Sequence, residues 1–152
     1  MYTLSFTTPF EYVESVRALL GVTVSELPDD TIMTLAIIGQ AEQDILSAVP
    51  NMKVIIEDTN TTVLRQNQLM IAFINFIAFY AYSPLKVSLL SSESDNKTIA
   101  TRFKDAFARD PNEFKAAAIK ALTQAGISIA SGHPDLLSLY KSNTDIITGN
   151  AQ

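Results

Sequence analysis

The residues with the clearest capacity for chemistry in this chain are two pairs of carboxylates. Glu11 with Glu14, or Glu42 with Asp44, could in principle supply a general acid and a general base. Residues two positions apart on a helix do not face each other, which argues against Glu42 and Asp44. Glu11 already fits a capping position at the start of a helix. We therefore expect both pairs to lie on a solvated face.

Metal and nucleophile chemistry have little support in the sequence. The one histidine, His133, lies between Gly132 and Pro134, a setting typical of a surface turn. A single imidazole cannot build a zinc site, and the chain has no cysteine to supply a thiolate ligand, a nucleophile or a disulfide. The five glycines are scattered and form no phosphate-binding loop. We predict that the chain is not an enzyme and uses no metal or cofactor.

Asn75 is the only side-chain amide in the uncharged, apolar segment Leu69–Tyr82. A helix that is apolar on every side has to be covered on every side. A buried amide without a partner costs about 1 to 3 kcal/mol, so we expect Asn75 to bond to a neighbouring helix and fix its register. Phe79, Tyr80 and Tyr82 are predicted to contact a neighbouring subunit. A bilayer needs about 20 apolar residues, so no membrane association is expected.

Length and charge suggest one domain that is built for contact with other proteins. The 152 residues fit a single core, and no secretion signal opens the sequence, which predicts synthesis in the cytoplasm. Charged residues form 18% of the chain, below the usual quarter. Residues 1–64 carry nine acids and two bases, whereas the remainder carries nine bases and seven acids. This asymmetry indicates either head-to-tail pairing of identical subunits or a solvated acidic face, and it disfavours binding of nucleic acid phosphates.

Apolar periodicity and helix-capping residues predict an all-α fold, a bundle of four to five helices around a long apolar central helix. The second helix should bury Ile32, Leu35 and Ile38. The central helix should begin at Asn60–Thr62 and end before Pro84, because proline breaks the helical hydrogen-bond pattern. The expected helices are residues 9–20, 29–49, 60–83, a stretch with helical spacing at 99–107, and 111–125.

The remaining segments are expected to be extended or irregular. Residues 1–7 alternate apolar and polar side chains, which fits a short strand or an arm lying on a neighbouring subunit. Residues 52–58 fit a strand or a packed loop, and residues 91–97 fit an exposed polar loop. We divide the chain into a helical domain, residues 1–140, and a C-terminal tail, residues 141–152.

The order of these elements resembles the head-tail connector proteins of tailed phages. The resemblance is carried by Phe10–Val22, then by Ser25–Ile32, and then by a helix that contains Ala41 and Glu42. The polar run 91–97 followed by an alanine-rich helix is similar to the later part of the family pattern. The similarity covers roughly residues 10–125; residues 52–58 and the helix expected after Gly132 depart from the family pattern.

The resemblance implies a structural virion protein that is located at the head-tail interface. Connector adaptors typically form a ring of twelve subunits beneath the portal protein, where they link capsid to tail and extend a channel through which DNA passes without specific binding. The implied partners are the portal protein, a downstream tail or stopper protein, and other copies of the chain. Family members commonly dock onto the portal through an extended C-terminal tail. The matching residues here are Tyr140, Asp145, Ile146 and Ile147.

Two other functions remain open from the sequence. One is a soluble helical adaptor or regulatory module that binds a partner's helix in an apolar groove. The other is a small enzyme with an unrecognised carboxylate site. The tail also has an alternative interpretation, because polar C-terminal segments are commonly frayed ends with no partner.

Overall fold

The computed structural model describes residues 10–92 and 110–127, and its side chains are described for residues 12–88 and 110–127. All regular elements in these ranges are helical, and no strand occurs among them, which confirms the all-α prediction. The expected arm at residues 1–7, the stretch 99–107 and everything from residue 128 onward, including the tail, lie outside the described residues. The helices are α1 (Phe10–Leu20), α2 (Asp29–Ile32), the π-helical turn η1 (Leu35–Gly39), α3 (Gln40–Ala48), α4 (Met52–Glu57), α5 (Val63–Ser92) and α7 (Asn112–Gln124).

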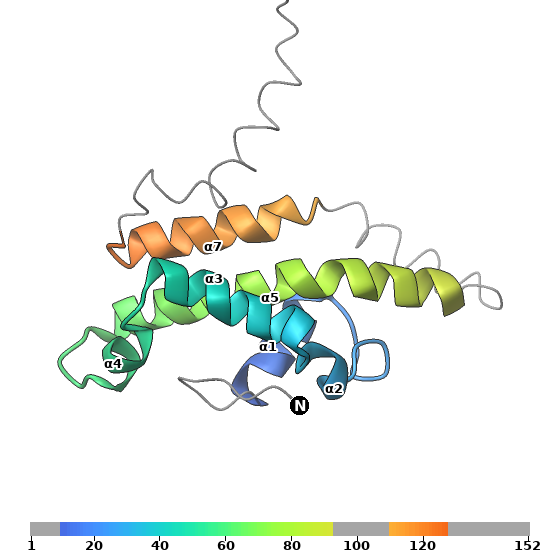
Figure 1. Ribbon diagram of the computed structural model, residues 1–152, viewed down its shortest axis with the longest axis horizontal. Helices are drawn as coiled ribbons and strands as arrows, with labels where there is room; N and C mark the ends of the chain where they lie inside the picture. The colour runs from blue at the N-terminus through green and yellow to red at the C-terminus, as the bar shows by residue number, and fades with distance from the viewer. Residues whose placement is uncertain (1–9, 93–109, 128–152) are drawn as a thin grey trace, which may run out of the picture.

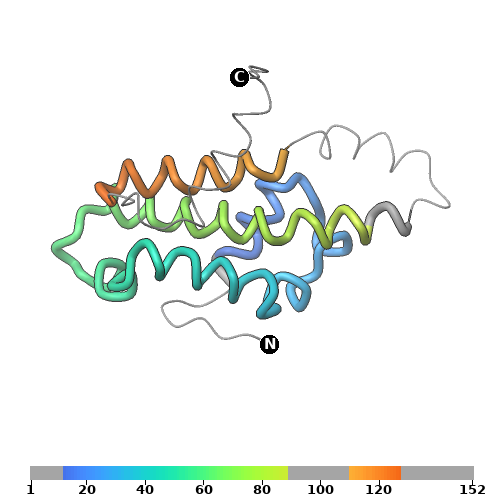
Figure 2. Tube along the Cα trace, turned by 45° about the horizontal axis from the view of Figure 1, so that its top comes forward, coloured from blue at the N-terminus to red at the C-terminus, as the bar shows by residue number. Residues whose placement is uncertain are grey.

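The long apolar helix α5 is the centre of the fold, as the sequence predicts. Figures 1 and 2 show α7 running along one side of α5, α3 along another, and α1 crossing it on a third. Phe73, Phe76 and Ile77 of α5 are fully buried by these neighbours. The buried side chains form one continuous cluster that draws on α1, α3, α5 and α7. Because α5 is buried on several sides, its apolar residues are not confined to one face of the helix.

Glycines end α1 and α7, directly after the predicted helix ends at residues 20 and 125. Gly21 has φ +71°, a left-handed conformation that residues with a Cβ atom rarely adopt. The Val22 N–H donates to the Arg17 carbonyl (3.1 Å) and the Gly21 N–H donates to the Ala18 carbonyl (3.3 Å). These two bonds form a Schellman motif, which satisfies carbonyls that the end of a helix would otherwise leave without partners. Gly126, with φ +76°, ends α7 through the same pair of bonds.

Asp110 caps the start of α7, next to residue 111, where the sequence predicts that this helix begins. A carboxylate oxygen of Asp110 accepts the N–H of Asn112 (2.9 Å), and the Asp110 carbonyl accepts the N–H of Glu113 (2.9 Å). The first N–H groups of a helix have no partner within it, so an Asx cap of this kind stabilises the helix start. Thr8, which precedes the predicted helix 9–20, lies outside the described residues.

The predicted second helix, 29–49, is wrong as a continuous element, because it breaks at Thr34. The backbone of Thr34 is extended (φ −84°, ψ 156°), and its hydroxyl donates to the Thr31 carbonyl (3.0 Å). Its own carbonyl then accepts the N–H groups of Ile37, Ile38 and Gly39, which starts the π-helical turn η1. The short polar side chain thus competes with the helical hydrogen bonds that apolar periodicity alone would continue.

The break changes which residues of this segment face the core. Leu35, predicted to be buried with Ile32 and Ile38, is exposed on η1, whereas Met33 and Ile37 are buried instead. An extra residue in the π turn rotates the positions on either side of it relative to one another. The predicted set of core residues was therefore correct only where the helical register survived.

Residues 52–58 were predicted as a strand or a packed loop, and both alternatives are wrong. Six of these residues form the short helix α4, in which Met52 and Ile55 are buried three positions apart while Val54 points outward. The three consecutive β-branched residues favour a strand locally. Burial of Met52 and Ile55 on one side of a helical turn outweighs that preference.

The prediction that the central helix ends before Pro84 is also wrong, because α5 continues to Ser92. Proline has no N–H group, so the Tyr80 carbonyl lacks its usual partner four residues along the helix. Ser83 and Pro84 are exposed, whereas Leu85 directly after them is buried. The ring therefore lies on the outer face of α5, and packing of Leu85 holds the helix together across it.

Candidate functional site

The aromatic residues predicted to contact another subunit are used within this subunit. Phe79 and Tyr82 of α5 meet Lys115 and Phe114 of α7, and Tyr80 packs against Phe79. We call these five residues the aromatic seam. The ring centroids of Tyr82 and Phe114 are 6.1 Å apart, and those of Phe79 and Tyr80 are 5.1 Å apart in an edge-to-face arrangement. Tyr82 is buried and the other two α5 rings are half-buried. The seam thus joins α5 to its neighbours within the chain, and contact of these residues with another subunit stays a prediction.

Tyr80 links the seam to α3 through a carboxylate. Its hydroxyl donates to a carboxylate oxygen of Asp44 at 2.8 Å, across 36 residues of sequence. Burial of the phenol raises the pKa of Tyr80 well above its usual value, and the hydrogen bond and the negative charge of Asp44 raise it further. Tyr80 is therefore a protonated hydrogen-bond donor at neutral pH. It is not an activated nucleophile or a base.

Lys115 supplies the positive charge of the seam. Its side chain is buried, and its ammonium nitrogen lies 5.5 Å from the centre of the Phe79 ring, within the range of a cation–π contact. Burial raises the pKa of the Tyr82 phenol, and the nearby charges of Asp110 and Glu113 raise it further. The arrangement is suited to holding α7 against α5.

Among the described residues, Asn75 makes no bond to a neighbouring helix, which is the bond the sequence predicts. It is 8% exposed, and its amide nitrogen donates to the Ile71 carbonyl of its own helix at 2.8 Å. Side chains with short polar ends commonly bond to the carbonyl four residues earlier. The amide nitrogen is bonded within its own helix. No bond between helices in the described part of the chain therefore supports a role for Asn75 in setting their register.

The carboxylate pairs do not form an acid and base site among the described side chains. Glu42 is 3% exposed and has a bonding partner, whereas Asp44 binds Tyr80, so the prediction that this pair lies on a solvated face is wrong. Glu14 is exposed as predicted, and the side chain of Glu11 lies outside the described residues. Within residues 12–88 and 110–127, no group of three potential metal-binding side chains occurs. His133 lies beyond these ranges.

Sequence reasoning missed the importance of Arg17, which holds α1 to the start of α2. Its buried guanidinium donates to the Leu27 carbonyl (3.3 Å) and to a carboxylate oxygen of Asp29, with which it forms a salt bridge. Glu26 also stabilises this connection locally, because one of its carboxylate oxygens accepts the N–H of Thr23 (2.7 Å). The connection between α1 and α2 is thereby a folded hook. An arginine among apolar positions of a predicted helix was the signal available in the sequence.

Gln66 fixes the turn between α4 and α5 in a similar way. Its side-chain nitrogen lies 3.1 to 3.3 Å from the carbonyl oxygens of Ile55, Ile56 and Asp58. These carbonyls lie at the C-terminal end of α4, where helical partners run out. One amide therefore stabilises the end of a six-residue helix that is too short to be stable alone.

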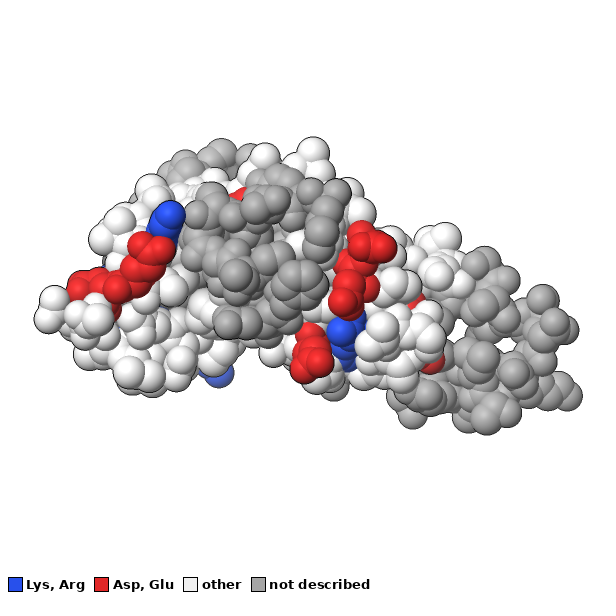
Figure 3. Space-filling model, turned by 90° about the horizontal axis from the view of Figure 1, so that it is seen from below, with Lys and Arg blue, Asp and Glu red and all other residues white. Residues whose placement is uncertain are grey.

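Several of the acids in the first 64 residues are engaged within the fold. Asp29 pairs with Arg17, Asp44 with Tyr80, and Glu42 is buried. Figure 3, a view from below, shows the acidic side chains of the described residues in short clusters beside basic ones. The surface formed by residues 1–64 is therefore less acidic than the number of acids in this segment suggests.

A set of apolar side chains on the N-terminal half of α5 remains uncovered. Val63 and Leu64 are each 69% exposed and Ile71 is 43% exposed. Leu64 and Ile71 are seven residues apart, which places them on one face of the helix. We call Val63, Leu64 and Ile71 the α5 stripe. Sequence analysis placed the excess apolar face at the other end of the same helix, so it missed this one.

One helix in the described residues is long and apolar enough to cross a membrane. The segment Val63–Ser88 has 26 residues and contains an 18-residue window with a mean hydropathy of 1.4; it is longer than the apolar segment 69–82 judged too short for this purpose. Half of the window is buried inside the fold, and the core helix of a water-soluble protein passes the same test. Its burial against three other helices is what a core helix requires.

Comparison with protein-family models, with curated proteins and with solved structures finds no match to this chain.

Proposed function

We propose that this chain is a head-tail connector adaptor of a tailed phage. In this role it forms a ring beneath the portal protein, extends the DNA channel and links the capsid to the tail. The proposal further places it in the virion at the head-tail interface, as a structural protein with no enzymatic activity and no cofactor. DNA passes through the ring without specific binding.

The observation that carries the proposal is the hook between α1 and α2. The segments on which the family resemblance rests, Phe10–Val22 and Ser25–Ile32, meet as one folded unit clasped by Arg17 on Leu27 and Asp29. The rest of the order also fits, because a long apolar α5 and an alanine-rich α7 follow the hook. A pattern whose parts form one unit is a stronger basis for comparison than scattered similar residues.

The proposal is tested by binding to the portal protein encoded near this gene. We expect purified chain to bind portal rings and to form a ring on them, detected by native mass measurement and electron microscopy. The gene should also lie beside portal, capsid and tail genes. A chain that stays monomeric in the presence of every portal protein encoded in its genome would refute the proposal. A monomer without portal would not, because assembly can require the partner.

The C-terminal tail is proposed as the portal-docking element. Tyr140, Asp145, Ile146 and Ile147 are its candidate contacts. The double substitution of Ile146→Asp and Ile147→Asp should abolish portal binding, because it removes the apolar side chains that would be buried. Replacing Asn150 with Asp adds charge to the same tail and should leave binding unchanged. Portal binding that survives loss of residues 141–152 would exclude the tail from the interface.

The alternative of an adaptor that binds a partner's helix makes a different prediction. Such a chain would bind an amphipathic helical peptide as a monomer, and its binding surface would be an exposed apolar face such as the α5 stripe. Replacing Leu64 with Asp would then abolish partner binding. In the connector proposal, the double substitution in the tail would do so.

A further inference from the structure

The α5 stripe is an exposed apolar surface that neither the fold nor the proposed function explains. Val63, Leu64 and Ile71 lie within about two turns of helix, in the N-terminal half of α5. Asn67, between Leu64 and Ile71, is exposed and uncharged. An exposed set of large apolar side chains is typical of a surface that contacts another protein.

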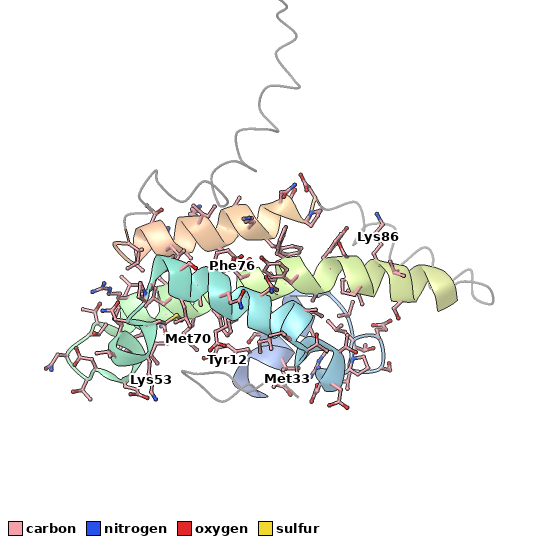
Figure 4. The ribbon with its side chains drawn as sticks, viewed as in Figure 1. Tyr12, Met33, Lys53, Met70, Phe76 and Lys86 are labelled. Carbon is pink, nitrogen blue, oxygen red and sulfur yellow. The ribbon has the colours of Figure 1, made fainter. Side chains whose placement is uncertain are left out.

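The helix α1 packs on another side of α5. Its Tyr12 hydroxyl donates to the sulfur of Met70 at 3.2 Å, and its Tyr12 ring packs edge to face on Phe73, with centroids 5.2 Å apart. Figure 4 shows Tyr12 and Met70 next to each other. Phe73 is two positions from Ile71, and residues at this spacing do not face the same side of a helix. The contact with α1 therefore leaves the stripe exposed.

The exposed residues of this face are arranged symmetrically about Asn67. Val63 lies four positions before Asn67 and Ile71 lies four positions after it, so all three share one face of α5. Both flanking residues are apolar and β-branched. The only charged residue from 63 to 74 is Arg65, two positions from both Val63 and Asn67 and hence on another side. The face thus has an uncharged polar centre between two apolar ends.

A face with this symmetry fits a second copy of itself in antiparallel orientation. Around a twofold axis through Asn67, Ile71 of one copy meets Val63 and Leu64 of the other, and the reverse contact forms at the same time. Apolar residues therefore meet apolar residues on both sides of the axis.

Asn67 is suited to the position on the axis, where a side chain meets its own copy. A side-chain amide carries two donors and an acceptor, so two amides bond to each other. Two carboxylates or two ammonium groups at this place would repel each other instead. Between the helices of coiled coils, a single asparagine of this kind fixes the register and the number of chains.

We propose that the chain forms a twofold dimer through the α5 stripe, with two copies of α5 crossing antiparallel at Asn67. Burial of the three stripe side chains removes at most about 300 Å² of apolar surface from water on each copy. A stable complex of standard size buries about 800 Å² per partner. The dimer is therefore weak, and its population depends on concentration. This inference does not rest on the connector proposal, because it concerns the free chain without a portal.

Sedimentation velocity over a concentration series tests the dimer. The mass should rise from 16.6 kDa toward twice that value as the concentration approaches the millimolar range. Leu64→Asp should hold the chain at the monomer mass, because it would bury a carboxylate twice in the interface. Val87→Asp, at a similarly exposed position near the other end of α5, should leave the dimer unchanged. A parent chain that stays monomeric throughout the series, or equal effects of the two substitutions, would overturn the proposal.

Opposite charges at position 67 test whether this residue meets its own copy. Asn67→Asp and Asn67→Lys should each be monomeric, because like charges would face each other on the axis. An equal mixture of the two variants should restore the dimer, because unlike charges then meet. Circular dichroism checks that both variants are folded. Dimerisation of either variant alone to the same extent as the parent, or a mixture that stays monomeric, would overturn the position of the axis.

A disulfide provides a second measurement that also captures a weak dimer. The chain has no cysteine, so Asn67→Cys introduces a single thiol. Two thiols that meet on the axis lie close enough to form a disulfide, and mild oxidation should link the chains in pairs. Val87→Cys is the control for random collision and should form far fewer linked pairs. Equal yields from the two variants would contradict the dimer.

Discussion

At the scale of single residues, buried charges in this protein stabilise backbone as well as other charges. Arg17 is the clearest case, since one guanidinium nitrogen contacts both the Leu27 carbonyl and the Asp29 carboxylate. A buried guanidinium that loses its partner keeps the cost of desolvation without the compensating interaction. The hook should therefore be sensitive to either member of the pair.

Replacing Asp29 with Ala should lower the free energy of unfolding by about 1 to 3 kcal/mol, because it leaves Arg17 buried without its carboxylate. Urea denaturation followed by circular dichroism measures the change. Asp30→Ala is the matched control, because Asp30 is exposed and belongs to the same first turn of α2. It should change the free energy by no more than about 0.5 kcal/mol. Equal effects of the two substitutions would contradict the assigned role of Asp29.

Tyr80 should make stability depend on alkaline pH. Its pKa is raised in the folded chain above the usual value of about 10, so the folded state holds the proton more tightly than the unfolded state. Its contribution is complete below about pH 10 and is lost as the pH rises above that value. Solvent screening of the half-exposed hydroxyl makes the loss shallower than that of a fully buried group. Urea midpoints at pH 8 to 11 should fall less steeply for Tyr80→Phe than for the parent. Identical slopes would show that the pKa of Tyr80 is not raised in the folded chain.

At the scale of elements, helix ends were predictable because their signals are local. Gly21 and Asp110 act through atoms within four residues, so a single sequence contains the whole interaction. The break at Thr34 and the helix at Met52–Glu57 were not predictable in this way. At Thr34 a hydroxyl bond to the Thr31 carbonyl competes with the helical bonds, and apolar periodicity does not show which one forms. At Met52–Glu57 burial of Met52 and Ile55 outweighs the local preference for a strand, and that burial depends on the rest of the chain.

Gly21→Ala should destabilise the fold by about 1 kcal/mol, because alanine is strained at the left-handed φ of this position. A Cβ atom at Gly21 would meet nothing within 4 Å, so the effect isolates backbone strain from steric clash. Gly21→Asn should cost less than Gly21→Ala, since asparagine tolerates this conformation better. Thermal unfolding of the two variants provides the comparison. A larger loss for Asn would contradict the assignment.

Pro84→Ala should stabilise the chain, because it restores an N–H donor for the Tyr80 carbonyl and removes the steric cost of proline. The cost of proline inside a helix is about 3 kcal/mol, which sets the upper limit of the gain. Ser83→Ala is the control, because this neighbouring residue is also exposed and already has its N–H group. Chemical denaturation measures both. Destabilisation by Pro84→Ala would show that the proline is favourable where it stands.

At the scale of the whole molecule, the core is one cluster to which residues from Tyr12 to Ala125 contribute. The sequence predicts its centre at residues 69–82 because that segment is apolar on every side. It does not predict that the aromatic seam lies inside the subunit. The partners of Phe79 and Tyr80 are Lys115 and Asp44, each more than 30 residues away, and only the folded chain brings them together. The α5 stripe was missed for the same reason.

The continuity of the core predicts cooperative unfolding. Ala118 of α7 is fully buried, so Ala118→Leu should push α7 away from α5 and cost about 1 to 3 kcal/mol. Ala117→Leu, at a half-exposed position on the same helix, should cost less. Far-ultraviolet and tyrosine signals should change together in one transition for both variants. Separate transitions for the two signals would show that α7 detaches independently.

The position of α7 in the chain also has a consequence for synthesis. α7 covers the side of α5 that carries Tyr82, through Phe114, yet it is made after α5 is complete. At about 5 to 20 residues per second, the ribosome needs roughly 2 to 6 seconds to extend the chain from the end of α5 to the end of α7. During that interval the nascent chain carries its most apolar helix with one side uncovered. We expect a chaperone to protect that side during this interval, or folding to be delayed until α7 has been made.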